Sequence, residues 1–182
     1  HASLLCLLAA LRHESCRHWC NAKQVEAHCG IRVDVVEDTV YQYTNGFREF
    51  QPNSHTLITS TGRLEGELTR RRLVESREDA VETALEIFAT VDEKGEGFWQ
   101  RFSEFEALDE LFNYPNGETA QLVPNPSYAC LRGLVVAQLL NRPNFEVLVD
   151  EHRARLDQLP TNPVVRSGYE SLVAALRGHW FH

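Results

Sequence analysis

The side chains best suited to chemistry crowd near the N-terminus, where thiols and imidazoles alternate over a short stretch. They are His13, Cys16, His18, Cys20, His28 and Cys29. Thiolate sulfur and imidazole nitrogen are the usual zinc ligands, and a tetrahedral site needs four of them. On a helix, Cys16 and Cys20 would share one face, and His28 or Cys29 would complete the set. The sequence therefore predicts a candidate zinc site at Cys16, Cys20, His28 and Cys29. The alternative is a group of ordinary buried thiols, which the Cys-x3-Cys spacing without a knuckle turn favours.

Two other constellations have a chemical and a structural interpretation. Carboxylates recur at Glu65 and Glu67 and again, at helical spacing, at Glu78, Glu82 and Glu86. Either set has the groups of an acid–base or metal site, but the simpler interpretation is a solvated face. Cys130 and His152 are candidates for a thiol–imidazole pair, although the apolar residues around Cys130 indicate burial. The sequence has no Gly-rich phosphate loop, no G-x-S-x-G and no H-E-x-x-H, so no reaction class is indicated.

The charge is acidic and unevenly distributed. The formal net charge is −8, and residues 75–118 contain thirteen acidic and three basic residues. An acidic surface argues against nucleic-acid binding and favours a basic protein partner. The same segment has a strongly aromatic stretch, residues 97–113, which serves either as a wide core face or as an exposed patch for a partner. The second interpretation predicts a partner-binding site at Glu96, Trp99, Glu104, Asp109 and Glu110.

The cysteine count and the hydropathy indicate the cellular compartment. Five cysteines, four of them within the first 29 residues, are no disulfide framework, so we expect free thiols in a reducing cytoplasm. Residues 2–11 are apolar, but they are too few for a membrane span and lack the basic region of a secretory signal. Their leucines recur at helical spacing. We therefore expect a packed helix there and no membrane association.

The hydrophobic periods predict an α+β fold in a single domain, residues 1–182. Residues 2–12 and 15–28 are expected to be helices. An antiparallel β-meander is expected over residues 31–73, since Asn45-Gly46 between alternating runs is a strong hairpin signal. Two helices are expected to cover this sheet, and the sheet and these helices together are expected to occupy residues 31–123.

The helices expected after the sheet begin with clear start signals. Ser76 opens the first with a capping box, and Val81, Ala84, Leu85 and Phe88 recur as its buried stripe. A second helix is expected over residues 97–113. Residues 124–182 are predicted to form a three-helix tail packed on the rest, with Asn162-Pro163 opening the last helix.

These patterns favour a non-enzymatic, acidic, cytoplasmic protein-binding module without a cofactor, from a bacterial source. Bacterial immunity proteins and secretion chaperones share its size, acidity and lack of motifs, so we expect a function of that type; the comparison is by class alone. The alternative is a zinc-binding or thiol-dependent protein that uses the N-terminal cysteines and histidines. The sequence does not indicate an oligomeric state.

Overall fold

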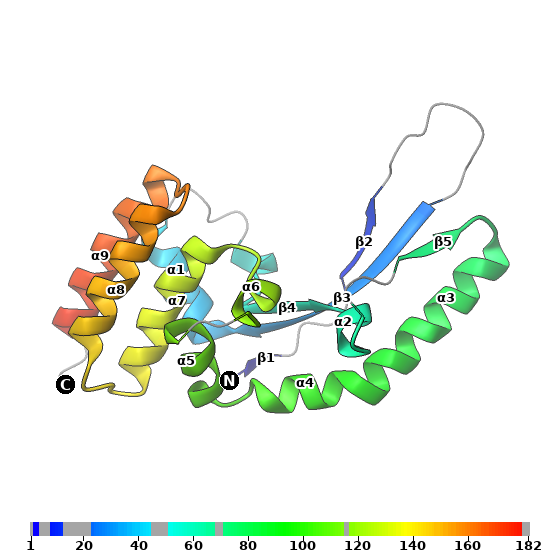
Figure 1. Ribbon diagram of the computed structural model, residues 1–182, viewed down its shortest axis with the longest axis horizontal. Coiled ribbons are helices and arrows are strands. Elements are labelled where there is room, and N and C mark those ends of the chain that lie inside the picture. Colours follow the sequence, from blue (N-terminus) through cyan, green and yellow to red (C-terminus); the bar gives the residue numbers. More distant parts are fainter. Residues whose placement is uncertain are drawn as a thin grey trace. The chain divides into compact units, whose positions relative to one another are not determined.

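The fold is α+β, with an antiparallel sheet near the N-terminus followed by a mostly helical region (Figure 1). The computed structural model describes residues 2–3, 8–12, 23–44, 51–67, 71–114 and 117–179. The chain divides into two compact units. The first unit comprises His1–Ser3, Ile31–Leu57 and Phe102–His182, and the second comprises Leu4–Gly30 and Ile58–Arg101. The prediction of a single domain stays a prediction.

Strand β3 (Lys23–Val33) is the common partner of all the other described strands. In the second unit it pairs antiparallel with β2 (Leu8–Arg12) and with β5 (Arg72–Val74). In the first unit its last residues pair antiparallel with β1 (Ala2–Ser3). β4 (Leu57–Ser60) also pairs with β3. The sheet is therefore organised around one long central strand.

The predicted N-terminal helical segment is wrong where the structure describes it, because residues 8–12 and 23–33 are strands. Along β3 every second residue is apolar. These residues are Val25, Ala27, Cys29, Ile31 and Val33. The last four of them are buried, as the period of two in a strand requires. A strict alternation of β-branched and small apolar residues was the available signal for a strand.

The predicted meander over residues 31–73 is also wrong in most of its length. Residues 34–43 form helix α1 (Asp34–Tyr43), and residues 61–64 form the short helix α2 (Thr61–Leu64). Within α1, Val36 and Val40 are one turn apart and both are buried, so the helix period accounts for them. Among the described residues after position 33, only β4 and β5 are strands. The Asn45-Gly46 hairpin turn lies outside the described residues.

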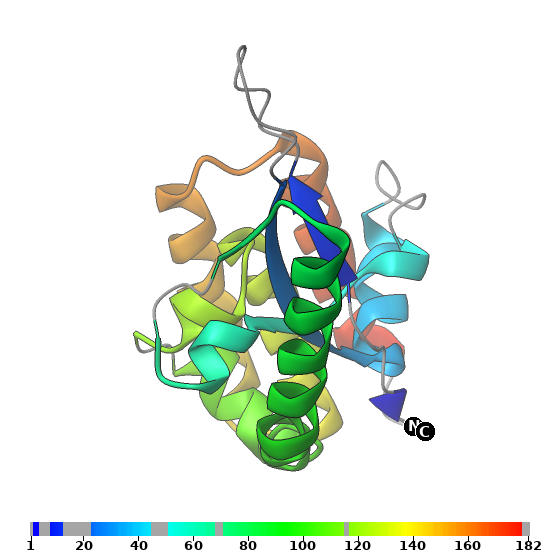
Figure 2. The same ribbon diagram turned by 90° about the vertical axis from the view of Figure 1, so that its right-hand side faces the viewer.

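Helix α3 (Arg77–Thr90) begins at the predicted capping box. Ser76 accepts a hydrogen bond from the Asp79 backbone N–H, and the Asp79 carboxylate accepts one from the Ser76 N–H. After Thr90 the chain continues through a π-helical turn, η2 (Val91–Gly95), which leads directly into α4 (Glu96–Arg101). Figure 2 shows α3 and α4 as one continuous green helix. The aromatic helix predicted over residues 97–113 is two helices, because α5 (Phe105–Asn113) starts anew after a break.

The predicted three-helix tail is confirmed as three helices in the first unit. They are α7 (Pro126–Leu139), α8 (Phe145–Gln158) and α9 (Pro163–His179), and the short α6 (Thr119–Leu122) precedes them. Helix α7 lies at the centre, since it contacts α1, α5, α8 and α9 and is buried from residue 127 to residue 137. The predicted start at Asn162-Pro163 is confirmed, because the Asn162 side chain accepts from the Val164 N–H at 2.8 Å. Asn125 caps α7 in the same way.

Two buried polar contacts tie α7 to its neighbours. Glu37 of α1 accepts two hydrogen bonds from Arg132 of α7, at 2.7 and 3.0 Å, and neither side chain is exposed beyond 5%. Asn113 of α5 donates to the α7 backbone at Gly133. Buried polar groups of this kind are stabilising only while every partner is present. They fix how α1, α5 and α7 pack.

Replacing Gly133 with alanine should destabilise the first unit. A methyl group at this position would lie 2.4 Å from Asn113 Oδ1 and 2.8 Å from His152 Nε2, so the side chains that bond each other there would have to separate. Overpacking of a core costs about 1–3 kcal/mol, and urea unfolding followed by circular dichroism measures it. Gly97→Ala is the matched control, because nothing lies within 4 Å of a methyl group at residue 97. Equal midpoints for the two variants would contradict the expectation.

Candidate protein-binding surface on α3 and α4

Helix α3 differs from an ordinary surface helix, because it buries threonines while three of its large apolar side chains are exposed. Thr83 and Thr90 are its buried residues, at 8% and 7% exposure. Val81, Leu85 and Phe88 are 54%, 65% and 62% exposed. The prediction that these three form a buried stripe is therefore wrong. Their spacing places them along one face, which we call the α3 stripe.

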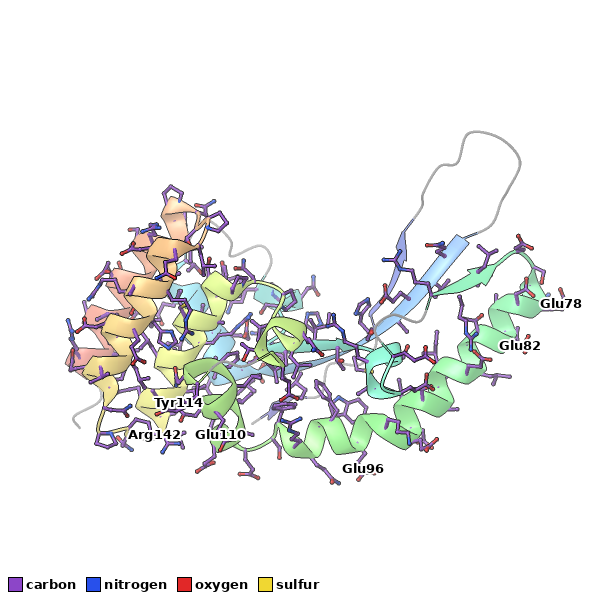
Figure 3. All side chains as sticks on the ribbon, in the orientation of Figure 1. Glu78, Glu82, Glu96, Glu110, Tyr114 and Arg142 are labelled. Atoms are coloured by element: carbon purple, nitrogen blue, oxygen red, sulfur yellow. The ribbon has the colours of Figure 1, made fainter. Side chains whose placement is uncertain are left out.

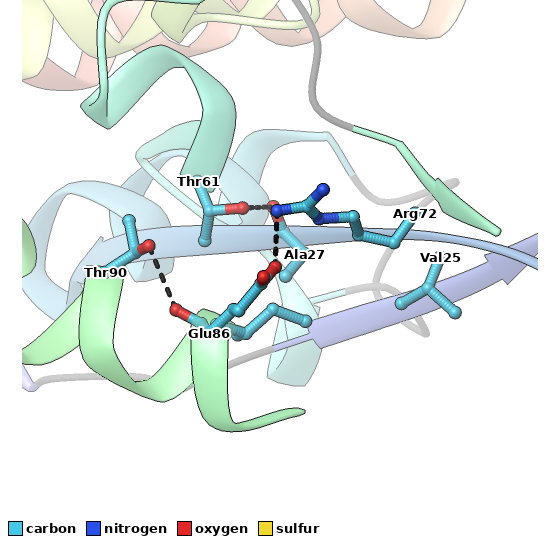
Figure 4. A pocket seen from close by; sticks show the side chains of 7 residues that line it. Val25, Ala27, Thr61, Arg72, Glu86 and Thr90 are labelled. Atoms are coloured by element: carbon cyan, nitrogen blue, oxygen red, sulfur yellow. Dashed lines mark hydrogen bonds and ion pairs between the residues drawn. The ribbon is translucent and has the colours of Figure 1, made fainter. Parts of the chain in front are cut away.

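The inward face of α3 is held by polar contacts within the second unit. Arg72 of β5 and Glu86 of α3 form an ion pair at 2.5 Å, and Thr90 donates to the Glu65 carboxylate at 2.9 Å. Figure 4 shows Arg72, Glu86, Thr90 and Thr61 around a small cavity of about 10 Å³, near the lower limit for one water molecule. Ile87 lines the same cavity beside Val25 and Ala27, so the inward face of α3 is partly polar and partly apolar. The α3 stripe lies outside this face.

The α3 stripe borders two open grooves. One is lined by the N-terminal half of α3 and includes Val81 and Leu85. The other lies at the junction of α3, η2 and α4, and its lining residues include Phe88, Glu96 and Trp99. Glu96 and Trp99, both predicted partner-binding residues, thus lie beside the exposed Phe88, for which the helical period predicts burial. Exposed apolar side chains that cluster along one face are typical of a surface that contacts another molecule.

Acidic residues accompany the stripe along its length. Glu78 and Glu82 line the first groove, together with one basic residue, Arg77, and Asp92 and Glu96 line the second. We call these four residues the acidic flank. Figure 3 shows Glu78, Glu82 and Glu96 projecting outward from the helix. Among the residues that the structure describes, Glu78, Glu82 and Asp92 have no basic partner, so their charge remains available to another molecule.

The π-helical turn shapes the second groove. Gly95 is buried beneath Trp99, since a methyl group at residue 95 would lie 3.2–3.5 Å from the indole ring. The indole N–H of Trp99 is itself shielded and finds no acceptor within the described part of the chain. A π-turn inside an α-helix is frequently a functional feature. Here it seats an aromatic ring next to the acidic side chains.

The other predicted partner-binding residues lie in the first unit, whereas Glu96 and Trp99 lie in the second. Glu104 and Glu110 are exposed. Asp109 is fully buried, accepts from Asn113 at 2.6 Å and pairs with Arg142 at 2.8 Å. The geometry therefore gives Asp109 a structural role and brings only Glu96 and Trp99 together at a groove.

The zinc prediction stays a prediction, because Cys16 and Cys20 lie outside the described residues. Its other two members, His28 and Cys29, are consecutive residues of β3 and so point to opposite faces of the sheet. Cys29 is 1% exposed, whereas His28 is half-buried. Over the described ranges, no group of three or more His, Cys, Asp or Glu side chains is arranged to hold a metal ion.

The remaining chemical candidates have structural partners. Burial raises the pKa of Cys130 to about 11, so its thiol is not an activated nucleophile. His152 is hydrogen-bonded to Asn113, at 2.6 Å. Of the repeated carboxylates, Glu65 and Glu86 make the contacts described above, which leaves Glu78 and Glu82 on the open side of α3.

Hydropathy and comparison add two findings. None of the helices in the described ranges has the length and apolarity needed to cross a lipid bilayer. Comparison of the chain with protein-family models, with curated proteins and with solved structures found no match.

Proposed function

We propose that this chain is a non-enzymatic, cytoplasmic protein-binding module that holds its partner on the α3 stripe and its acidic flank. The observation that carries the proposal is the exposure of the α3 stripe. A helix of a globular protein normally packs its apolar face on its own core, whereas α3 places threonines, an ion pair and Ile87 on that side and presents Val81, Leu85 and Phe88 outward. A partner that covered the stripe would remove this apolar area from water.

The proposal predicts that the stripe contributes little to folding. The double variant Val81→Ala, Leu85→Ala should unfold within about 0.5 kcal/mol of the parent, because both side chains are solvated and alanine favours the helix. Leu134→Ala, at a fully buried position of α7, should cost about 2–5 kcal/mol. Urea midpoints measure both. A loss of several kcal/mol from the double variant would show that the stripe belongs to the core.

Site-specific photo-crosslinking in the source cell tests the binding itself. A benzophenone amino acid is placed at Phe88 or, as a matched control, at Tyr114, an exposed aromatic residue of the first unit. We expect a discrete covalent adduct with another protein from position 88 and none from position 114. Adding Leu85→Ala should reduce the adduct at least about tenfold if Leu85 is an interface anchor. Val147→Ala, an equally exposed apolar residue on α8, should leave it unchanged.

Two outcomes would overturn the proposal. One is the absence of any adduct at position 88. The other is an adduct whose yield is the same at positions 88 and 114 and does not respond to Leu85→Ala.

A further inference from the structure

The shape of the stripe narrows the class of partner. Val81, Leu85 and Phe88 follow one another along a single helix at steps of four and three residues. On the side away from Glu78 and Glu82, the wheel of α3 places the small residues Ala80 and Ala84. Small residues next to an apolar ridge let a second helix approach closely. A narrow, straight ridge with one shallow side is suited to a helix lying along it.

Charge narrows the class further. Four carboxylates of the acidic flank border the grooves at both ends of the ridge, and three of them have no basic partner among the described residues. A helix seated on the ridge would bring its own flanking residues within reach of these carboxylates. Lys or Arg at those positions would pair with them, whereas Asp or Glu would be repelled.

A second copy of this chain would not satisfy these contacts. In an antiparallel pair of α3 helices, the same flanks face each other, so Glu78 and Glu82 would meet the carboxylates of the other copy. In a parallel pair, the acidic flank would face Ala80, Ala84 and a single basic residue, Arg77, so most of its carboxylates would stay unpaired. Each chain also has a net charge of −8, which adds long-range repulsion.

We infer that the occupant of the α3 stripe is an amphipathic helix of a different protein, with Lys or Arg along one side of its apolar face. This inference rests on the proposed function and specifies its partner. The apolar contacts would hold the helix in place, and the opposite charges would fix its orientation and accelerate the encounter.

The probe is a synthetic helix of about 18 residues, or five turns, with leucines on one face and lysines beside them; a matched peptide has glutamate at every lysine position. Fluorescence anisotropy measures binding to the full chain. We expect the lysine peptide to bind and the glutamate peptide not to bind. Leu85→Ala and the double reversal Glu78→Lys, Glu82→Lys should each weaken binding at least about tenfold. Val147→Ala and Glu151→Lys, exposed substitutions on α8, should leave it unchanged, and added salt should weaken it.

The outcomes separate this inference from the proposed function. Equal binding of the two peptides, or binding of the lysine peptide that ignores both stripe and flank substitutions, overturns the inference. So does a crosslinked partner segment at position 88 that is acidic or lacks apolar residues at helical spacing, although that adduct would still support the proposed function. Self-association in sedimentation that Leu85→Ala abolishes would identify a second copy as the occupant. Absence of any adduct at position 88 overturns both.

Discussion

Replacing Arg132 with methionine should lower the free energy of unfolding by about 3–5 kcal/mol, because it would leave a buried carboxylate without its countercharge. Glu37 is fully buried, and burial alone would raise its pKa. The charge and hydrogen bonds of Arg132, with the hydrogen bond from Thr56, outweigh burial and hold the pKa of Glu37 below its usual value. Arg132 also donates to the backbone carbonyl of His55, so methionine would remove several bonds at once. Urea unfolding at neutral pH measures the loss.

Two companion variants separate the burial of a lone charge from simple loss of contacts. The double variant Glu37→Leu, Arg132→Met removes both charges and should recover more than half of the stability that Arg132→Met loses. Arg177→Met breaks an ion pair with Glu146 in which both side chains are about half exposed, and such a pair contributes at most about 1 kcal/mol. If the double variant were less stable than Arg132→Met, an unpaired charge would not be the cause of the loss.

The second large effect is a loss of stability in acid that depends on His152. Asn113 donates to the Asp109 carboxylate and to the carbonyl of Gly133, so its amide oxygen faces His152 Nε2, which must donate. His152 is thus held neutral, and burial lowers its pKa to about 3. In the unfolded chain the pKa is about 6.5. The stabilisation is therefore complete above pH 6.5 and is lost as the pH falls from there towards 3.

Between pH 7 and pH 4.5 this group alone should remove roughly 3 kcal/mol of stability. His152→Gln keeps a donor for Asn113 without titrating, so the difference between the pH profiles of parent and variant isolates the histidine from the carboxylates. Urea midpoints across this range provide the profiles. A difference that stays constant with pH would mean that His152 titrates alike in the folded and unfolded chain. Arg155 at 3.4 Å from His152 Nδ1 adds to the disfavour of a second positive charge.

The sequence predicted best where several local signals agreed. Helices α7 and α9 combine a helical period with Asn–Pro starts, and α3 begins where Ser76 and Asp79 can cap each other. The prediction is wrong where a single signal decides it. In α1 the β-branched residues favour a strand, although Val36 and Val40 are one helical turn apart. In β3 the prediction is a helix, although the apolar residues alternate with a period of two.

The candidate surface shows a different limit. The period of Val81, Leu85 and Phe88 correctly indicates an apolar helix face, but a period says nothing about what covers that face. Burial of Thr83 and Thr90 depends on β5 and on Glu65, contacts that no local pattern encodes. Glu96 and Trp99 are predicted from the acidic and aromatic composition of their segment, and their role in binding stays a prediction. The acidity of its segment predicts Asp109 on the same surface, but its buried ion pair with Arg142 joins residues 33 positions apart in the sequence, too far to be inferred from spacing.

At the π-helical turn between α3 and α4, the number of residues matters more for the structure than which residues they are. Asp92, Glu93 and Lys94 are all exposed, so substitutions there would disturb little packing. Removing or inserting one residue would instead rotate everything that follows by about 100° around the axis. Glu96 and Trp99 would then no longer lie on the same side of the helix as Phe88. Variants of this chain should therefore tolerate substitutions in this segment but not insertions or deletions.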